Sequence, residues 1–282
     1  MSARLMMVLL VFLLGTGLAQ AFNLDIGKLI DAGKSAGDLK PIDEKGEAEI
    51  GSTAAASILG AAPLVKNQKV QEYVNQVGLW LALQTERPDL PWRFAVLDTD
   101  TVNAFAAPGG YVFITRGLLL HMRNEAELAG VLAHEISHVL RKHHLNAIQK
   151  NAQTGLVTNL VGTFTGGNGG LADEAKKRLL SVSTELYARG LDQSDEFEAD
   201  RMGVVIAARA GYDPYGLPAT LQTLDSMNAQ DSSLALMFKT HPTPEKRLLQ
   251  LDGLMTGTMD AYAAQPIVAD RFMKVVGEYA KK

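Results

Sequence analysis

The sequence of 282 residues has no cysteine, and this absence excludes both disulfide bonds and a lipid-modified cysteine behind a leader segment. It also has no surplus of positive charge, because 31 acidic residues outnumber 27 basic ones. Proteins that bind nucleic acid need clustered lysine and arginine against the phosphates, so we expect no nucleic-acid partner. Because the sequence has no cysteine for a lipid, any membrane attachment must be noncovalent or depend on an uncleaved anchor.

Long apolar runs are equally scarce, and the one that stands out lies at the beginning of the chain. Arg4 precedes an apolar run over residues 5–14, and Ala19-Gln20-Ala21 follows in the small-x-small form that signal peptidases cleave. We therefore predict a signal peptide over residues 1–21 and an exported protein, with the bacterial periplasm as its compartment. The alternative is a retained membrane anchor, because no charged residue occurs between Leu5 and Leu24.

The rest of the chain has the composition of a folded globular protein. Hydrophobic residues make up 47% of the sequence and charged residues 21%, values close to those of soluble domains. Residues 22–46 are polar and punctuated by glycine, so we interpret them as an N-terminal arm. We predict one main domain over residues 47–255 and a C-terminal extension over residues 256–282.

The spacing of apolar residues predicts a small sheet followed by several helices. Apolar residues recur at spacings of three and four from Val70 to Leu81, which is typical of an amphipathic helix. Asn124, with Glu127 three residues later, resembles a capping box that opens a helix running to about His143. The glycine-rich apolar stretch at residues 155–170 is interpreted as a mobile loop or lid, with peripheral membrane contact as the alternative. The remaining predictions are extended segments at 93–97 and 103–115 and helices at 173–187, 193–210, 218–227 and 244–251.

His134, Glu135 and His138 form the H-E-x-x-H pattern inside the helix predicted from Asn124. The i, i+4 spacing turns both imidazoles to one face of the helix, where they can bind one tetrahedral zinc ion. Glu135 lies about 100° further round the helix, beside the metal, where its carboxylate can take a proton from a zinc-bound water. The pattern predicts one Zn2+ per chain and the hydrolysis of peptide bonds.

A run of carboxylates within residues 195–200 is the predicted source of a third ligand. Glu196 is favoured because Asp200 lies one turn further along the same helical face, where it can accept a hydrogen bond from a ligating histidine and fix its tautomer. Glu198 remains the rival ligand, although its i+4 neighbour is Met202. An acidic helix start, stabilised by the helix dipole, is the alternative interpretation of the whole run.

Four blocks of sequence follow one another between residues 103 and 247. They are Asn103-Ala104-Phe105-Ala106 with Pro108-Gly109-Gly110, residues 132–138 around the zinc pattern, Glu196-Phe197-Glu198-Ala199-Asp200-Arg201, and His241-Pro242 with Arg247. In this combination and order the chain resembles the HtpX and CAAX-prenyl-protease family of zinc metallopeptidases, which also contains the β-barrel assembly-enhancing protease.

The resemblance implies an α+β, mostly helical metallopeptidase domain of the gluzincin type, with a small β-sheet beside the zinc-binding helix. It implies Glu196 as the third zinc ligand. It also places Asn103, Ala104 and Phe105 beside the cleft, where an extended segment can pair with a substrate strand. An ordinary hairpin is the alternative for that segment.

The resemblance also implies a role for His241, either as a fourth zinc ligand in a resting state or as a stabiliser of the oxyanion during catalysis. Arg247 is assigned to substrate binding, with a salt bridge to the acidic helix as the alternative. His121, His143 and His144 are interpreted as surface residues.

Two features separate this chain from other branches of that family. No later apolar run is long enough for a membrane span, and the residues after Arg247 are too few for an array of tetratricopeptide repeats. We therefore predict a stand-alone, exported zinc endopeptidase that acts on unfolded or misassembled cell-envelope proteins. The alternatives are a latent or noncatalytic zinc-bound protein with a chaperone-like role and, in weaker agreement with the four blocks, a metal-dependent hydrolase of nonpeptide bonds.

Overall fold

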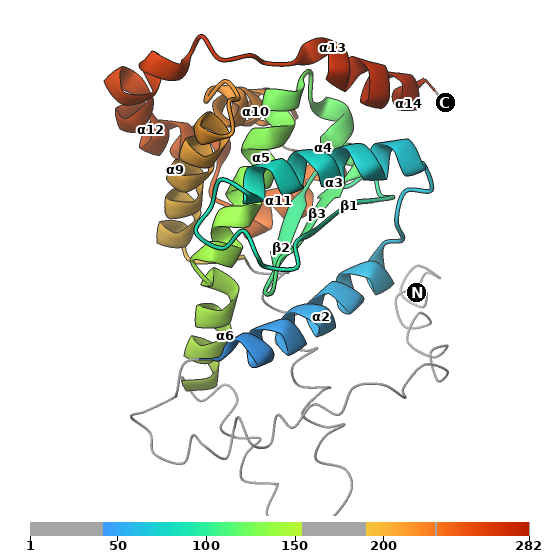
Figure 1. The fold of residues 1–282 in the computed structure, drawn as a ribbon, viewed down its shortest axis with the longest axis vertical. Helices are drawn as coiled ribbons and strands as arrows, with labels where there is room; N and C mark the ends of the chain where they lie inside the picture. The colour runs from blue at the N-terminus through green and yellow to red at the C-terminus, as the bar shows by residue number, and fades with distance from the viewer. Residues whose placement is uncertain (1–41, 154–189, 229, 282) are drawn as a thin grey trace, which may run out of the picture.

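The structure is a computed structural model that describes residues 42–153, 190–228 and 230–281. The predicted signal peptide, the stretch at 155–170 and the helical pattern at 173–187 lie outside the described residues. Over the described ranges the chain is mostly helical and has a three-stranded sheet, which confirms the predicted α+β class (Figure 1). No helix in these ranges is both long enough and apolar enough to cross a bilayer.

The predicted helices and strands that fall within the described residues occur in the predicted order, and α2, α4, α6, α11, α13 and α14 are additional helices. Their bounds are α2 Glu44–Ala61, α3 Gln68–Ala82, β1 Arg93–Leu97, β2 Ala104–Ala107, β3 Tyr111–Thr115, α4 Arg116–His121, α5 Glu125–Leu140, α6 His143–Gln153, α9 Gln193–Arg209, α10 Gly216–Asp225, α11 Ala235–Thr240, α12 Pro244–Leu254, α13 Ala269–Phe272 and α14 Glu278–Ala280. Short 3₁₀ or π-helical segments lie at Ser232–Leu234, Met255–Met259, Asp260–Tyr262 and Met273–Gly277.

The sheet is covered by helices on both faces. Its strand order is β1-β3-β2, with β1 parallel and β2 antiparallel to β3. Side chains alternate between the two faces, so Val112 and Ile114 join the main core with α3 and α5, whereas Leu97 and Phe113 pack with α2. Figure 1 shows α3 and α2 on opposite sides of the strands. Strand β2 is an edge strand of this sheet.

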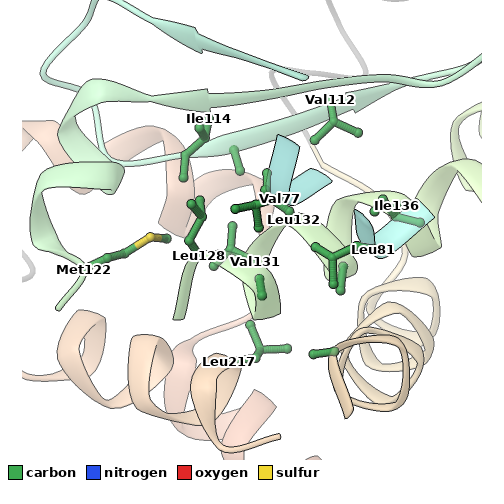
Figure 2. Close-up of a cluster of buried hydrophobic side chains, with 14 of the residues drawn as sticks. Val77, Leu81, Val112, Ile114, Met122, Leu128, Val131, Leu132, Ile136 and Leu217 are labelled. Atoms are coloured by element: carbon green, nitrogen blue, oxygen red, sulfur yellow. The ribbon is translucent and has the colours of Figure 1, made fainter. Parts of the chain in front are cut away.

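Helix α5 passes through the centre of the molecule, and every residue from Glu125 to Leu140 is buried. Figure 2 shows the side chains of Leu128, Val131 and Leu132 of α5 between Ile114 of β3 and Leu217 of α10. A helix held on all sides in this way has little freedom to shift, because protein interiors are close-packed. The helix that carries the H-E-x-x-H pattern is therefore a fixed part of the core.

Two local features differ from what the sequence predicts. The helix expected to reach His143 ends at Leu140, and Lys142, with a left-handed φ of 57°, redirects the chain into α6. Helix α2 is not predicted at all, because its alanine, glycine and serine residues give only a weak apolar pattern. Its small residues serve close packing: a Cβ added at Gly51 would lie 1.7 Å from the carbonyl oxygen of Pro108.

The segment after residue 255, predicted as an extension, packs on the main core. Phe272 is 1% exposed and lies in the same apolar cluster as α3 and α5. The neighbouring Arg271 pairs with the buried carboxylate of Glu125, the first residue of α5, which also accepts hydrogen bonds from Tyr73 (2.6 Å) and Tyr212 (2.7 Å). The boundary at 255 stays a prediction, but the C-terminal helices are joined to the start of α5.

Candidate metal centre

Two imidazoles of α5 face one another one helical turn apart. The Nε2 atoms of His134 and His138 are 3.1 Å apart, and both side chains are 2–3% exposed. The helix that holds them begins at Asn124, whose Oδ1 accepts a hydrogen bond from the Glu127 amide at 3.0 Å. The Glu127 carboxylate accepts from the Arg123 amide at 2.9 Å, one residue earlier than in a standard capping box. The predicted cap is therefore present in a shifted form.

Glu196 of α9 brings a carboxylate to the same point. Its Oε2 lies 3.7 Å from His134 Nε2 and its Oε1 lies 3.6 Å from His138 Nε2. The approach of the two helices depends on Gly203, where an added Cβ would lie 2.8 Å from the His134 amide nitrogen. The structure therefore brings together the three residues predicted as metal ligands.

The donor set fits a divalent cation. Ligand atoms about 2.0–2.2 Å from a tetrahedral zinc lie roughly 3.3–3.5 Å from one another, close to the separations of these three side chains. Oε2 of Glu196 is buried and has no hydrogen-bond partner among the described residues. Burial raises the pKa of Glu196 well above its ordinary value, and a cation bound at this position would favour the negative form of the carboxyl.

Asp200 fixes the orientation of His134. Its Oδ1 lies 2.9 Å from His134 Nδ1, and Arg247 binds the same carboxylate through Nε (2.9 Å) and Nη2 (2.5 Å). Burial opposes ionisation, but the charge and hydrogen bonds of Arg247 and the hydrogen bond from His134 hold the pKa of Asp200 well below its ordinary value. A carboxylate must accept from Nδ1–H, which leaves the lone pair of Nε2 directed at the metal position.

Arg247 itself is almost fully buried and is occupied by Asp200. The predicted role of Arg247 is substrate binding, and the alternative is a salt bridge to the acidic helix. The structure contains that salt bridge. Arg247 also lines a cavity that Glu135 lines. The salt bridge is therefore compatible with a role in substrate binding, which stays a prediction.

Glu135 is buried next to the ligands and faces two adjoining cavities. One of its oxygens lies within 4.8 Å of ligand atoms of His134 and His241. Burial raises the pKa of Glu135 to about 8 for the protein side chains alone. A dication at the neighbouring position lowers such a pKa, and it thereby favours the carboxylate form that can accept a proton.

His241 directly follows α11, and the centroid of its ring lies 6.0 Å from that of His134. Its Nε2 lies 3.6 Å from Glu196 Oε2, and its Nδ1 lies 2.9 Å from the Thr240 hydroxyl. That hydroxyl donates to the Leu236 carbonyl at 2.9 Å, so it accepts from Nδ1–H of His241. Burial lowers the pKa of His241 well below its ordinary value. The ring is therefore neutral, with the Nε2 lone pair facing Glu196.

The residues predicted to contact substrate lie in the cavity walls. Asn103, Ala104 and Phe105 line the first cavity together with Glu135 and Glu196, and Asn103 and Ala104 also line the second. The Nδ2 atom of Asn103 is buried and has no hydrogen-bond partner among the described residues. An unpaired buried donor of this kind is costly, and it is often kept for a ligand.

The interpretation of His143 and His144 as surface residues is wrong. They are 3% and 9% exposed, and both of their rings lie beside the ring of His138, at centroid distances of 5.1 Å and 5.7 Å. Nδ1 of His143 lies 2.9 Å from Nδ1 of His138. His121, in contrast, is exposed as predicted.

Three contributors to the site are not predicted by the sequence patterns. Thr240 sets the tautomer of His241, and Glu198, considered only as a rival ligand, instead contacts His143. Gly190, with a φ of 85°, lines the first cavity, and an added Cβ there would meet the Thr240 carbonyl. A glycine between polar residues is a signal for such a turn, but the sequence does not show what the turn contacts.

Comparisons with known proteins agree with this geometry. The model of the family described as peptidase family M48 matches residues 68–255. The beta-barrel assembly-enhancing protease of Escherichia coli O157:H7 is 32% identical over 233 residues, which cover 82% of this chain and 47% of that protein. The mitochondrial metalloendopeptidase OMA1 of Arabidopsis thaliana is 30% identical over 159 residues, covering 56% of this chain and 30% of that protein. The metalloprotease LoiP of Escherichia coli strain K12 is 27% identical over 158 residues, covering 56% of this chain and 60% of that protein. The chain spans about half the length of the assembly-enhancing proteases that it matches.

Proposed function

The chain belongs to peptidase family M48 and is a metalloendopeptidase, and we propose that it hydrolyses unfolded or misassembled cell-envelope proteins with one zinc ion held by His134, His138 and Glu196. Membership of this family confirms the resemblance indicated by the four sequence blocks. The observation that supports the ligand set is the convergence of three buried donor atoms, one of which is an unpaired carboxylate oxygen.

Glu135 is the proposed general base. Zinc at this site would supply Lewis acidity, lowering the pKa of a bound water and polarising the scissile carbonyl. Glu135 accepts the proton of the attacking water and later delivers it to the leaving amine. Asp200 and Arg247 keep His134 in the tautomer that leaves Nε2 free for the metal.

The substrate is proposed to bind as an extended strand along the edge strand β2. Strand β2 (Ala104–Ala107) lies at one edge of the three-stranded sheet, and Ala104 and Phe105 line the first cavity beside Glu135. The side-chain Nδ2 of Asn103, which has no hydrogen-bond partner among the described residues, supports this proposal because Asn103 precedes β2 and lines both cavities. A substrate carbonyl is the acceptor that suits it.

The substrate class and the compartment are proposed from the relatives. One relative is named for β-barrel assembly and matches 82% of this chain. We infer an exported, periplasmic enzyme of envelope protein quality control, with the cleaved signal peptide over residues 1–21 and the uncleaved anchor as alternatives for its first segment.

The first test compares the cleavage of unfolded casein by the wild type, Glu135→Gln and the exposed-site control His121→Ala. We expect Glu135→Gln to keep one zinc per chain and to lose activity by about 100- to 10,000-fold, because a proton acceptor is removed without a ligand. His121→Ala should cleave as the wild type does. Equal cleavage by Glu135→Gln would refute the assignment of the general base.

A latent state is the second candidate, and the geometry of His241 favours it. Its Nε2 lone pair faces the proposed metal position, as a fourth ligand's would, whereas an oxyanion stabiliser would present an N–H group there. If His241 blocks the open position, His241→Ala should raise the rate of casein cleavage. If it stabilises the oxyanion, the same variant should lower the rate.

A chaperone-like role predicts that suppression of client aggregation is unchanged by Glu135→Gln.

A further inference from the structure

His138 has an outer partner that the pattern of zinc ligands does not include. Its Nδ1 lies 2.9 Å from Nδ1 of His143, which is 3% exposed. On the far side of that ring, His143 Nε2 lies 3.3 Å from Oε2 of Glu198. The other oxygen of Glu198 is bound by Arg141 Nε at 2.7 Å. A continuous chain of polar contacts therefore runs from His138 to the protein surface.

The hydrogens along this chain can be assigned from its two ends. If His138 Nε2 gives its lone pair to the metal, the proton of the neutral ring lies on Nδ1 and must be donated to His143 Nδ1. His143 then carries its own proton on Nε2 and donates it to the carboxylate of Glu198. Every contact has one donor and one acceptor in this direction.

We propose that His143 is a positioning residue that holds His138 in its zinc-binding tautomer and orientation, with Glu198 fixing the tautomer of His143 in turn. The inference rests on the proposed role of His138 as a zinc ligand. With this inference, each proposed histidine ligand of the protein has an outer partner. Asp200 is the partner of His134, and the pair of His143 and Glu198 is the partner of His138.

The backbone is shaped to make this contact. In one continuous helix, residues five apart point about 140° away from each other, so the rings of His138 and His143 would not meet. The left-handed turn at Lys142 removes that obstacle, although such a φ is disfavoured for a residue other than glycine. Lys142 is held in place by Glu47 of α2, whose Oε2 lies 3.2 Å from Nζ.

The start of α6 is also anchored by apolar packing. Leu145 is 2% exposed and packs with Ile50 of α2. Helix α2, which the sequence did not predict, therefore supports both the turn at Lys142 and the first turn of α6. These contacts support the backbone on both sides of His143.

The test measures zinc affinity by competition with a chromophoric chelator in the full chain. In the rotamer of the histidine, an asparagine oxygen can occupy the place of Nδ1, whereas the polar end of a glutamine lies nearer the place of Nε2. We expect His143→Ala and His143→Gln to weaken zinc binding by about 10- to 100-fold, and His143→Asn to restore most of the loss because it keeps the acceptor for His138. The control His121→Ala should bind zinc as the wild type does.

A second readout is the visible spectrum of the cobalt-substituted protein, which reports the geometry of the ligands. The bands should shift in His143→Gln and return toward the wild-type positions in His143→Asn. Both variants are compared at equal helicity, so that a general loss of folding affects them alike. Equal zinc affinity and equal spectra for the asparagine and glutamine variants would overturn the inference.

His138→Ala separates this inference from the proposed function. If that variant still binds one zinc with wild-type affinity, His138 is not a ligand and the proposed metal site is wrong. If His138→Ala loses zinc while His143→Ala retains wild-type affinity, the metal site stands and only the positioning role of His143 is refuted.

Discussion

The two histidines of α5 are supported by regions of very different character. Behind His134, the side chains of Asp200 and Arg247 are 0% and 7% exposed. Behind His138, the chain through His143 ends in Glu198 and Arg141, which are 34% and 50% exposed. Water and salt weaken the second ion pair, whereas the first acts in a medium of low dielectric constant. The proposed ligand His134 is thus tied to the core, and the proposed ligand His138 is tied to the rim of the same site.

The geometry of α9 explains this difference. Asp200 lies one turn beyond Glu196 and shares its face toward α5, so it enters the core with the ligand. Glu198 lies about 160° away around the helix, at the edge of the contact, and it reaches His138 only through His143. A carboxylate at the rim needs an intermediate ring to act on a buried ligand.

The largest predicted effect comes from Asp200→Ala, which removes the buried carboxylate that contacts His134 and Arg247. This variant leaves Arg247 charged and unpaired in the interior, which should lower the free energy of unfolding by about 3–5 kcal/mol. Zinc affinity should also fall, by roughly 100-fold. Urea denaturation and chelator competition measure the two losses. Adding Arg247→Leu should restore most of the stability but not the zinc affinity, and a loss no larger than that of Glu198→Ala would contradict the comparison.

Gly203→Ala should disturb both regions together. The added methyl group meets the backbone at His134 and forces α9 away from α5, which should cost about 1–3 kcal/mol of stability. Because Glu196 moves with α9, zinc affinity should fall in the same variant. Gly60→Ala, where nothing lies within 4 Å, is the matched control and should leave both quantities unchanged or slightly improved. Wild-type zinc binding by Gly203→Ala would show that the helix contact is adaptable.

The buried His144, which lies beside His138, should make the stability of the protein depend on pH. Burial lowers the pKa of His144 from 6.5 to about 3. Between these values the unfolded chain binds a proton that the folded chain does not, so stability falls as the pH falls through that window. We expect the metal-stripped protein to lose more stability between about pH 7.5 and about pH 5.5 than the variant His144→Gln, by about 1 kcal/mol. Equal losses would show that His144 is accessible to protons when folded.

The smallest predicted effect is that of Glu198→Gln. An exposed ion pair contributes little, so the free energy of unfolding should change by less than about 0.5 kcal/mol. Zinc affinity should fall by less than about tenfold, and the difference from the wild type should shrink at high salt. A loss of zinc affinity as large as that of Asp200→Ala would mean that the contacts behind His138 and those behind His134 are equally important.

Much of this fold and site is predictable because local patterns determine it. The spacing from Val70 to Leu81 predicts α3, the alternation at Arg93–Leu97 predicts β1, and the H-E-x-x-H pattern with the later carboxylates brings three donors together. Each of these signals is contained in one short segment.

The features that the sequence did not predict depend on contacts between distant segments. Helix α2 has little apolar periodicity, and its residue Gly51 is required by the close approach of the Pro108 backbone, which is 57 positions further along the chain. The burial of His143 depends on a left-handed residue that is not glycine, at Lys142, which is held by a carboxylate nearly a hundred positions earlier in the chain. No propensity scale includes a partner of that kind.

The carboxylate of Glu125 joins the last helices of the chain to the beginning of α5 through Arg271, Tyr73 and Tyr212. If the C-terminal helices detach, this carboxylate is left in an apolar pocket without its cation, so detachment and fraying of α5 are energetically linked. The two segments should therefore exchange their amide hydrogens as one cooperative unit, although 146 positions separate Glu125 from Arg271. A fluctuation of the C-terminal helices is then also a fluctuation of the helix that bears two of the proposed metal ligands.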